Sequence, residues 1–492
     1  MKRKRMTGDS AEDLSPELRV VGERLRAASQ PVPRDPAFTA RLRADLLLAH
    51  QARPTPLPRR LRLARGSWRL VLLAAVLAAF GGGFAAARVL APAPEPGTVL
   101  MGQVPILRTI FVGATAGALA VDARTERAFV VTQSEPVQGR FPRMLIRVLD
   151  TTTGALLYTV TLGTASGIGT SAVAVDRRAG RVFVARADPT GGDSAGVVSV
   201  LDARSGAVLR RTTLPRRPTT RTSSDTLLTR TTVGIDERTG HAFIAIPRAN
   251  AVAVLDTHSG ALLRTSGVGM APGDLAVDAM QGRVVVANSG AATVSILDAG
   301  SGRVLRTVVV SGVPTAVAVD EQTGRAFVTL RGTTDRRGAL VLGTGHVAVL
   351  DVRTGRVLRS VAVPATPSVV AVAAGTGRVF VAGAVASGDG RVSMLDAATG
   401  RLLHTAMVGA YPASMAVVAH DGSVVVSTWP RPGAAARGAS VVSVLDARTG
   451  RVTHSINASM GLLSPGPLAV DERTGQVFLA SDTTVSGLDA RR

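Results

Sequence analysis

The chain contains no cysteine. This absence excludes disulfides, thiolate-ligated zinc, covalent haem attachment through cysteine and a thiol nucleophile. It does not indicate a compartment, because a cysteine-free protein is compatible with oxidising and reducing surroundings alike. Aromatic residues are also scarce, at 3% of the sequence. A single-stranded nucleic-acid groove needs aromatic side chains on which bases can stack, so this composition does not favour one.

Lysine is nearly absent, although the formal net charge is +22. Lys2 and Lys4 are the only lysines, and the other basic residues, histidine apart, are arginines. Many of these arginines follow a repeated Thr-Gly pair, so we expect them to be scattered over the surface rather than gathered in one stripe. We therefore predict no nucleic-acid partner.

What the sequence does contain is a repeat built from two turn-forming phrases. The clearest copy reads AVDEQTGRAFV at 318–328 and VAVLDVRTGRVL at 347–358. Each phrase reads as strand, Asp-x-x-x-Gly turn, strand, because aspartate can accept backbone hydrogen bonds within a turn and glycine can adopt φ > 0. One repeat therefore holds four short strands, A to D, and repeats of this size and composition predict a β-propeller.

The number of repeats follows from the turn centres. The first phrase, between strands A and B, is centred at Asp122, Asp176, Asp236, Asp278, Asp320, Ala373, Val418 and Asp471. The second phrase, between strands C and D, is centred at Asp150, Asp202, Asp256, Asp298, Asp351, Asp396, Asp446 and Asp489. These aspartates have a structural task in the turns, so we do not expect them to be catalytic. The count predicts an all-β, eight-bladed propeller, or seven blades if the divergent copy around Val418 is not a separate blade.

The two ends of the repeat region complement each other. The last repeat stops after its C strand, and the missing D strand is found near the start, where LRTIFVG at 107–113 matches VLRTVV at 304–309. An N-terminal strand that completes the last blade closes the ring and removes an exposed sheet edge. We therefore expect Ile110 to pair close to Val485.

A proline also recurs six positions before the centre of the first phrase, at Pro272, Pro314, Pro367, Pro412 and Pro465. Together with the two phrases, these prolines resemble the YVTN/YncE-type β-propeller repeat family over about residues 104–492. The resemblance implies the fold. It does not imply an activity, because propellers host many unrelated functions.

An uncharged apolar segment precedes the repeats. It reads LVLLAAVLAAFGGGFAAA at 70–87, and at about 1.5 Å per residue it covers roughly 27 Å, close to a hydrocarbon core. Trp68 lies at its start, and the preceding arginines are Arg59, Arg60, Arg62, Arg65 and Arg69. Because only Arg88 follows closely, the charge bias predicts one transmembrane helix at 67–88 with a cytoplasmic N-terminus.

This topology divides the chain into four parts. A cytoplasmic arm at 1–66 precedes the transmembrane helix, and a Pro-rich linker at 89–103 leads to an extracytoplasmic propeller at 104–492. The predicted location is the cell membrane, with a single crossing. Ala85-Ala86-Ala87 would suit a signal-peptidase site, but a stretch of 69 residues is too long for the charged region of a signal peptide.

The cytoplasmic arm predicts two short amphipathic helices. The first begins near Ser15-Pro16, and the second carries Phe38, Leu42 and Leu46 on one face. The segment DPAFTARLRADLLLAH at 35–50 resembles cytoplasmic pieces of bacterial membrane-anchored anti-sigma-type regulators, although it lacks their His/Cys zinc motif. This resemblance implies a cytoplasmic protein partner at 1–66, whereas the simpler interpretation is an anchoring tail.

Variation in loop length points to one face of the ring. It falls in the B–C loops at 133–143, 186–196, 331–345 and 428–440 and in one D–A connection at 214–231. Function concentrates where a rigid scaffold presents irregular loops. The candidate binding rim on this face comprises Phe141, Tyr411, Trp429, Arg216, Arg217, Arg336, Arg337, Arg431 and Asp274. We expect the two aromatic residues of the seventh blade to meet on this rim and Asp274 to face the central channel in contact with solvent.

The excess of arginine on this rim predicts an anionic envelope ligand or a protein as the partner. We expect no catalytic residue, cofactor or metal, because the histidines are dispersed among the repeats and one tryptophan follows the apolar segment. The sequence therefore predicts a membrane-tethered, extracytoplasmic binding or scaffold module. The alternatives are an anti-sigma-like transmembrane regulator with a sensing propeller and a propeller enzyme of lactonase or quinoprotein type.

Overall fold

The computed structural model describes residues 106–113, 115–134, 142–164, 171–187, 194–215, 231–332, 344–429, 441–457, 466–481 and 483–489. The chain divides into two units, 1–98 and 99–492, and all described residues belong to the second. The predicted arm at 1–66, transmembrane helix at 67–88 and linker at 89–103 lie outside the described residues. Within the described ranges, no helix is long and apolar enough to span a membrane.

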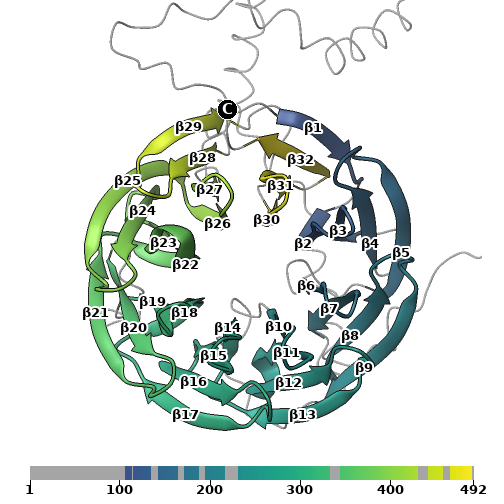
Figure 1. The fold of residues 1–492 in the computed structure, drawn as a ribbon, viewed down its shortest axis with the longest axis horizontal. Coiled ribbons are helices and arrows are strands. Elements are labelled where there is room, and N and C mark those ends of the chain that lie inside the picture. Colours follow the sequence, from purple (N-terminus) through teal and green to yellow (C-terminus); the bar gives the residue numbers. More distant parts are fainter. Residues whose placement is uncertain are drawn as a thin grey trace, which may run out of the picture. The chain divides into compact units, whose positions relative to one another are not determined.

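The second unit is a ring of eight four-stranded antiparallel sheets, which are numbered here as blades 1 to 8 (Figure 1). Blade 1 comprises β2 (Thr115–Asp122), β3 (Arg127–Gln133), β4 (Arg143–Asp150) and β5 (Leu156–Thr164). Blade 2 comprises β6 (Ser171–Asp176), β7 (Arg181–Ala187), β8 (Ser194–Asp202) and β9 (Val208–Pro215). Blade 3 comprises β10 (Val233–Asp236), β11 (His241–Ile246), β12 (Ala251–Asp256) and β13 (Leu262–Gly267). Blade 4 comprises β14 (Pro272–Asp278), β15 (Arg283–Asn288), β16 (Thr293–Asp298) and β17 (Val304–Val309).

The second half of the ring repeats this pattern. Blade 5 comprises β18 (Val313–Asp320), β19 (Arg325–Arg331), β20 (Gly345–Asp351) and β21 (Val357–Val363). Blade 6 comprises β22 (Thr366–Ala373), β23 (Arg378–Ala384), β24 (Asp389–Asp396) and β25 (Leu402–Ala410). Blade 7 comprises β26 (Pro412–Val418), β27 (Ser423–Thr428), β28 (Val441–Asp446) and β29 (Val452–Asn457). Blade 8 comprises β30 (Leu468–Asp471), β31 (Gln476–Ala480), β32 (Thr484–Asp489) and β1 (Ile106–Phe111).

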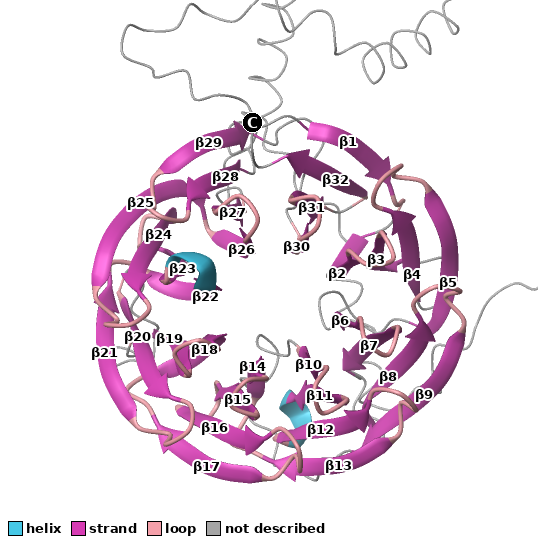
Figure 2. Cartoon of the chain, in the orientation of Figure 1, coloured by secondary structure: helices cyan, strands magenta, loops and turns pink. Residues whose placement is uncertain are grey.

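The eight-bladed prediction is confirmed, and the seven-bladed alternative is wrong. Blade 7, which contains the divergent copy around Val418, forms a complete four-stranded sheet of its own. This sheet forms although valine replaces the aspartate at the centre of its A–B turn, because Val418 is fully buried and packs with Val425 and Val444. The helices among the described residues are two 3-10 turns, η1 (Pro247–Ala249) and η2 (Ala374–Thr376) (Figure 2).

Strand β1 closes the ring as predicted. It pairs antiparallel with β32, with Ile110 opposite Val485, and the N–H of Val112 donates to the carbonyl oxygen of Thr483 at 2.7 Å. The contact of β1 with blade 1 also matches the repeat. A Cβ atom on Gly154 would lie 2.7 Å from Cδ of Arg108, just as one on Gly355 would lie 2.9 Å from Cδ of Arg306 in β17. β1 therefore occupies the place of a D strand.

The hydrophobic core lies between neighbouring blades. Six B strands place a fully buried phenylalanine there, namely Phe129, Phe183, Phe243, Phe327, Phe380 and Phe478. In the cluster between blades 1 and 2, Phe129 packs with Val182 and Leu201 of the next blade. Six of the scarce aromatic residues thus lie where two sheets face each other, and valine, alanine and leucine make up most of the other buried hydrophobic residues.

Both turn phrases form as predicted. Oδ1 of Asp320 accepts the N–H of Gln322 at 3.1 Å in an A–B turn. Oδ1 of Asp446 accepts the N–H of Thr449 at 2.7 Å and its hydroxyl at 2.7 Å in a C–D turn. The hydroxyl and N–H bonds from Thr449 stabilise the charged carboxylate and hold the pKa of Asp446 below its ordinary value, against a smaller opposing effect of burial.

Candidate functional site

The two faces of the ring differ in their connections. In every antiparallel blade, the A–B and C–D turns share one face, which is called the tight-turn face here, and the B–C and D–A connections share the other, the variable-loop face. The long connections, such as those between β7 and β8 and between β19 and β20, belong to the variable-loop face. The prediction that length variation falls on a single face is therefore confirmed.

Most of the candidate binding rim lies outside the described residues. This applies to Phe141, Arg216, Arg217, Arg336, Arg337 and Arg431, so their grouping stays a prediction. Tyr411, Trp429 and Asp274 are described, and they come from two different parts of the ring. Tyr411 and Trp429 belong to blade 7, whereas Asp274 belongs to blade 4.

Tyr411 and Trp429 are neighbours through their backbones. The N–H of Trp429 donates to the carbonyl oxygen of Tyr411 at 3.0 Å, and Trp429 is 42% exposed. Tyr411 adopts φ of +30°, in the left-handed region that side chains rarely occupy. Its ring covers Gly388, where a Cβ atom would lie 2.7 Å from the tyrosine hydroxyl oxygen. A backbone bond thus places the exposed Trp429 next to Tyr411, whose ring packs over Gly388.

The other blades show that this aromatic pair is a local departure from the repeat. Where described, the equivalent positions hold Thr115 and Gln133, Ala271 and Ser289, Val313 and Arg331, and Thr366 and Ala384. Only blade 7 places two aromatic residues there among the five described pairs. Folding does not require them, because the Ala271–Ser289 pair makes the same backbone bond, at 3.1 Å.

Asp274 contacts the next blade. It is half-buried, and its Oδ2 accepts the N–H of Val317 in blade 5 at 2.9 Å. Its Oδ1 accepts the N–H of Leu275 at 3.0 Å. Its contact with solvent in the central channel stays a prediction, whereas the bond to the backbone of the next blade is a contact that the sequence does not reveal. Asp274 links blades 4 and 5.

A pocket on the tight-turn face lies between blades 1 and 2. Its volume is about 230 Å³, and it is lined by the A–B turns of both blades and the C–D turn of blade 2. The charged residues of the lining are Arg124, Arg177, Arg178, Arg181, Arg204, Asp122 and Asp202. Five arginines against two aspartates give this lining a formal charge of +3. Five arginines thus gather at one junction between blades, which the repeat spacing did not predict.

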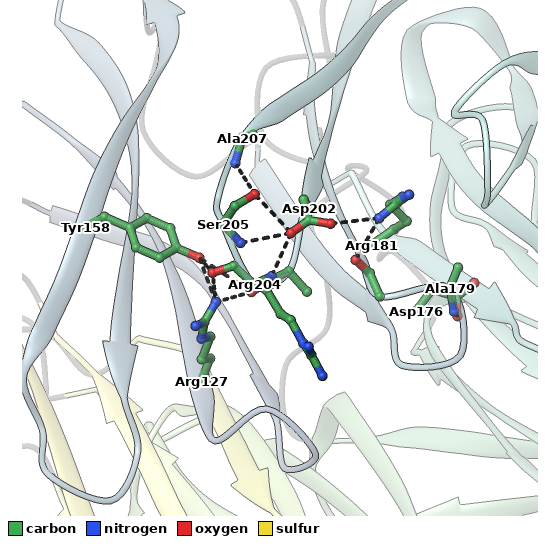
Figure 3. A network of polar contacts seen from close by, with 11 residues as sticks. Arg127, Tyr158, Asp176, Ala179, Arg181, Asp202, Arg204, Ser205 and Ala207 are labelled. Atoms are coloured by element: carbon green, nitrogen blue, oxygen red, sulfur yellow. Dashed lines mark hydrogen bonds and ion pairs between the residues drawn. The ribbon is translucent and has the colours of Figure 1, made fainter.

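The wall formed by blade 2 is ordered by a polar network (Figure 3). Nη1 of Arg181 donates to Oδ2 of Asp202 at 2.9 Å, and Oδ1 of Asp202 accepts the N–H of Ser205 at 2.8 Å. The bonds from Ser205 lower the pKa of Asp202, so this carboxylate stays charged and bound within its own turn. The side chain of Arg204 points away from Asp202 (Figure 3).

Arg127 fastens this wall to blade 1. Its Nη1 donates to the carbonyl oxygen of Ala203 at 2.8 Å, and its guanidinium lies 5.8 Å from the centre of the Tyr158 ring (Figure 3). Burial raises the pKa of the Tyr158 hydroxyl. The pocket is thus built on a fixed junction between two blades.

Further contacts position the arginines nearer the centre of the face. Nη1 of Arg124 donates to the carbonyl oxygen of Arg177 at 2.8 Å, and Arg177 forms an ion pair with Glu472 of blade 8 at 3.1 Å. Nη1 of Arg178 is 3.4 Å from the carbonyl oxygen of Glu237 in blade 3. The side chains of Arg124, Arg178 and Arg204 are exposed, so their remaining donors are accessible to a ligand.

The histidines lie where the repeat predicts. His241 opens β11 with Nδ1 2.9 Å from the carbonyl oxygen of Ala299, and His404 and His454 lie in the D strands β25 and β29. In the part of the chain that the structure describes, no group of three His, Asp or Glu residues could hold a metal ion.

Comparison with known proteins identifies the fold and one sequence match. Residues 343–492 match the family model described as outer membrane protein assembly factor BamB. No curated protein matches the sequence. The narrower resemblance to YVTN/YncE-type repeats stays a prediction.

Three solved structures are similar to this chain at low sequence identity. BamB from Moraxella catarrhalis is 18% identical, with 78% of this chain and 99% of that chain covered and a TM-score of 0.51. Hydrazine synthase from Kuenenia stuttgartiensis is 17% identical over 49% of this chain and 70% of that chain, with a TM-score of 0.41. Raptor from Chaetomium thermophilum is 14% identical over 78% of this chain and 28% of that chain, with a TM-score of 0.44. The protein is an eight-bladed β-propeller, and its C-terminal blades are similar in sequence to the BamB family.

Proposed function

We propose that this protein is a membrane-tethered, extracytoplasmic scaffold that binds a protein partner through its variable-loop face. The Tyr411–Trp429 pair, in which Trp429 is exposed and Tyr411 half-buried, carries this proposal. A rigid aromatic pair at one place in a repeat that does not need it for folding is typical of a binding hot spot. The similarity of residues 343–492 to an outer membrane assembly factor supports it, because that region includes both aromatic residues.

The tether rests on the sequence. The uncharged segment at 70–87 and its preceding arginines support a single transmembrane helix. A propeller held close to a membrane meets membrane-bound partners at a raised effective concentration. An anionic envelope ligand and the regulator with a partner at 1–66 remain hypotheses.

Trp429 is expected to supply a large share of the binding energy. It is 42% exposed, and its backbone is already held by Tyr411, so little order is lost when a partner covers it. Truncating a tryptophan hot spot costs about 2 kcal/mol or more, which corresponds to a loss of affinity of roughly 30-fold.

Photocrosslinking tests this assignment. A benzoylphenylalanine in place of Trp429 in the full-length chain should give a discrete protein adduct in the producing cells. The matched control is the same substitution at Met280, which is 67% exposed in the β14–β15 turn on the tight-turn face. A Trp429→Ala variant should then retain the identified partner about 30-fold more weakly. No adduct from position 429, or the same adducts from both positions, would refute the proposal.

A further inference from the structure

We propose that the pocket between blades 1 and 2 binds a phosphate group. The repeat itself provides the comparison, because the same three turns meet at every junction of the ring. At the other seven junctions, the residues equivalent to the pocket lining have a formal charge of −1 or 0, against +3 here. No other junction holds more than three arginines at these positions.

The charge of +3 already counts both pocket acids, whose carboxylates are held by their own turns and by Arg181. Oδ1 of Asp122 accepts the N–H of Arg124 at 3.0 Å, and its Oδ2 accepts the hydroxyl of Thr125 at 2.7 Å. Asp202 is bound by Ser205 and by Arg181. Two acids outside the lining contact Arg177. Glu237 accepts its backbone N–H, and Glu472 forms an ion pair with its guanidinium.

Three arginines therefore have donors left for a ligand. Arg124 comes from the A–B turn of blade 1, Arg178 from the A–B turn of blade 2 and Arg204 from the C–D turn of blade 2. Guanidinium groups bind phosphate oxygens through paired, charge-assisted hydrogen bonds. A phosphate can accept such bonds from several sides, whereas a carboxylate offers two oxygens and one charge.

The ligand can be free or attached to a larger molecule. All three side chains are exposed, so the pocket admits either inorganic phosphate or the terminal phosphate of an ester, including a lipid headgroup. The chemistry at the arginines is the same in both cases, and the choice of probe separates them.

Calorimetric titration of the full-length chain in a nonionic detergent tests the proposal. The probes are inorganic phosphate and dihexanoyl phosphatidic acid below its micellar concentration. The test variant is Arg178→Gln with Arg204→Gln. The matched control is Arg238→Gln with Arg353→Gln, which removes exposed arginines from the same two repeat positions in blades 3 and 5. Both variants lower the net charge equally.

We expect saturable binding at one site, weakened at least about 10-fold in the test variant and less than about 2-fold in the control, because only the first loses direct contacts. Binding of phosphatidic acid but not inorganic phosphate, with the same dependence on the variants, also supports the proposal and assigns an esterified ligand. No saturable binding of either probe, or an equal loss in both variants, overturns it. Trp429→Ala should leave phosphate binding unchanged, so this result is independent of the proposed scaffold function.

Discussion

Replacing Gly206 by alanine tests how closely the blades approach each other. Gly206 lies in the C–D turn of blade 2 with φ of +71°, and a Cβ atom there would overlap the ring of Tyr158 in blade 1. Gly180, in the A–B turn of the same blade, has φ of +65° and no atom within 4 Å of an added Cβ. Both glycines therefore need a positive φ, but only at Gly206 would an added Cβ atom also meet a side chain of the neighbouring blade.

The expected costs follow from this difference. A left-handed conformation costs alanine about 1–2 kcal/mol relative to glycine, and this applies to both variants. Overpacking against a neighbouring side chain adds about 1–3 kcal/mol, and this applies only to Gly206→Ala. The Tyr158 ring does not move away freely, because its hydroxyl bonds the carbonyl oxygen of Arg204 at 3.3 Å and its face contacts Arg127.

Urea unfolding of the full-length chain, followed by far-ultraviolet circular dichroism, measures these costs. The midpoint should fall more for Gly206→Ala than for Gly180→Ala. Adding Tyr158→Ala to Gly206→Ala should cost less than the sum of the two single changes, with a coupling of about 1–3 kcal/mol. Equal midpoints for the two glycine variants, or strict additivity with Tyr158→Ala, would show that the contact between blades does not determine this glycine.

Two further predictions concern ring closure and acid stability. Ile110→Asp should lower the free energy of unfolding by about 2–3 kcal/mol, because the Ile110 side chain is half-buried against Val112 and Val485. Phe111→Asp, at a site that is 73% exposed on the same strand, should lower it by less than about 0.5 kcal/mol. Similar urea midpoints for the two variants would contradict closure of the ring by β1. The second prediction concerns the aspartates of the C–D turns. Each accepts hydrogen bonds from the Ser or Thr three residues later in the chain, and these bonds lower the pKa values of Asp150, Asp202, Asp256, Asp298, Asp351, Asp396 and Asp446. Because the folded pKa values lie below the unfolded value of about 3.9, this stabilisation is present above that pH and is lost as the pH falls through the folded values. The urea concentration at the unfolding midpoint should therefore decrease when the pH is lowered below about 4. Asp278 acts in the opposite direction, because burial raises its pKa. A midpoint that stays unchanged down to about pH 3 would refute this prediction.

The strands and turns could be predicted because their causes are local. The bond from Gln322 to Asp320 spans two residues, so a single turn phrase contains all that it needs. Ring closure could be predicted as well, because the repeat is in phase at both ends and β1 supplies the strand that blade 8 lacks. The proximity of Tyr411 and Trp429 follows from the same register, since they flank the open end of one hairpin, next to the Pro412–Thr428 pair.

The arginine pocket and the role of Asp274 could not be predicted in this way. Arg124 and Arg204 are eighty residues apart, and they line one pocket only because blade 2 packs against blade 1. Asp274 finds its donor on Val317, in another sheet. Such contacts depend on the distance and angle between blades, which repeat spacing does not contain.

By itself, then, the sequence determined the strand order and the closing strand, because both follow from periodic local patterns in which turn residues and alternating strands recur. It left eight or seven blades open, and the complete sheet of blade 7 decided for eight. Only the tertiary structure decided which arginines of different blades share a pocket and which carboxylate is already occupied. The physical reason is that hydrogen-bond donors and charges act over a few ångströms in space, and the packing of one sheet on the next sets those distances.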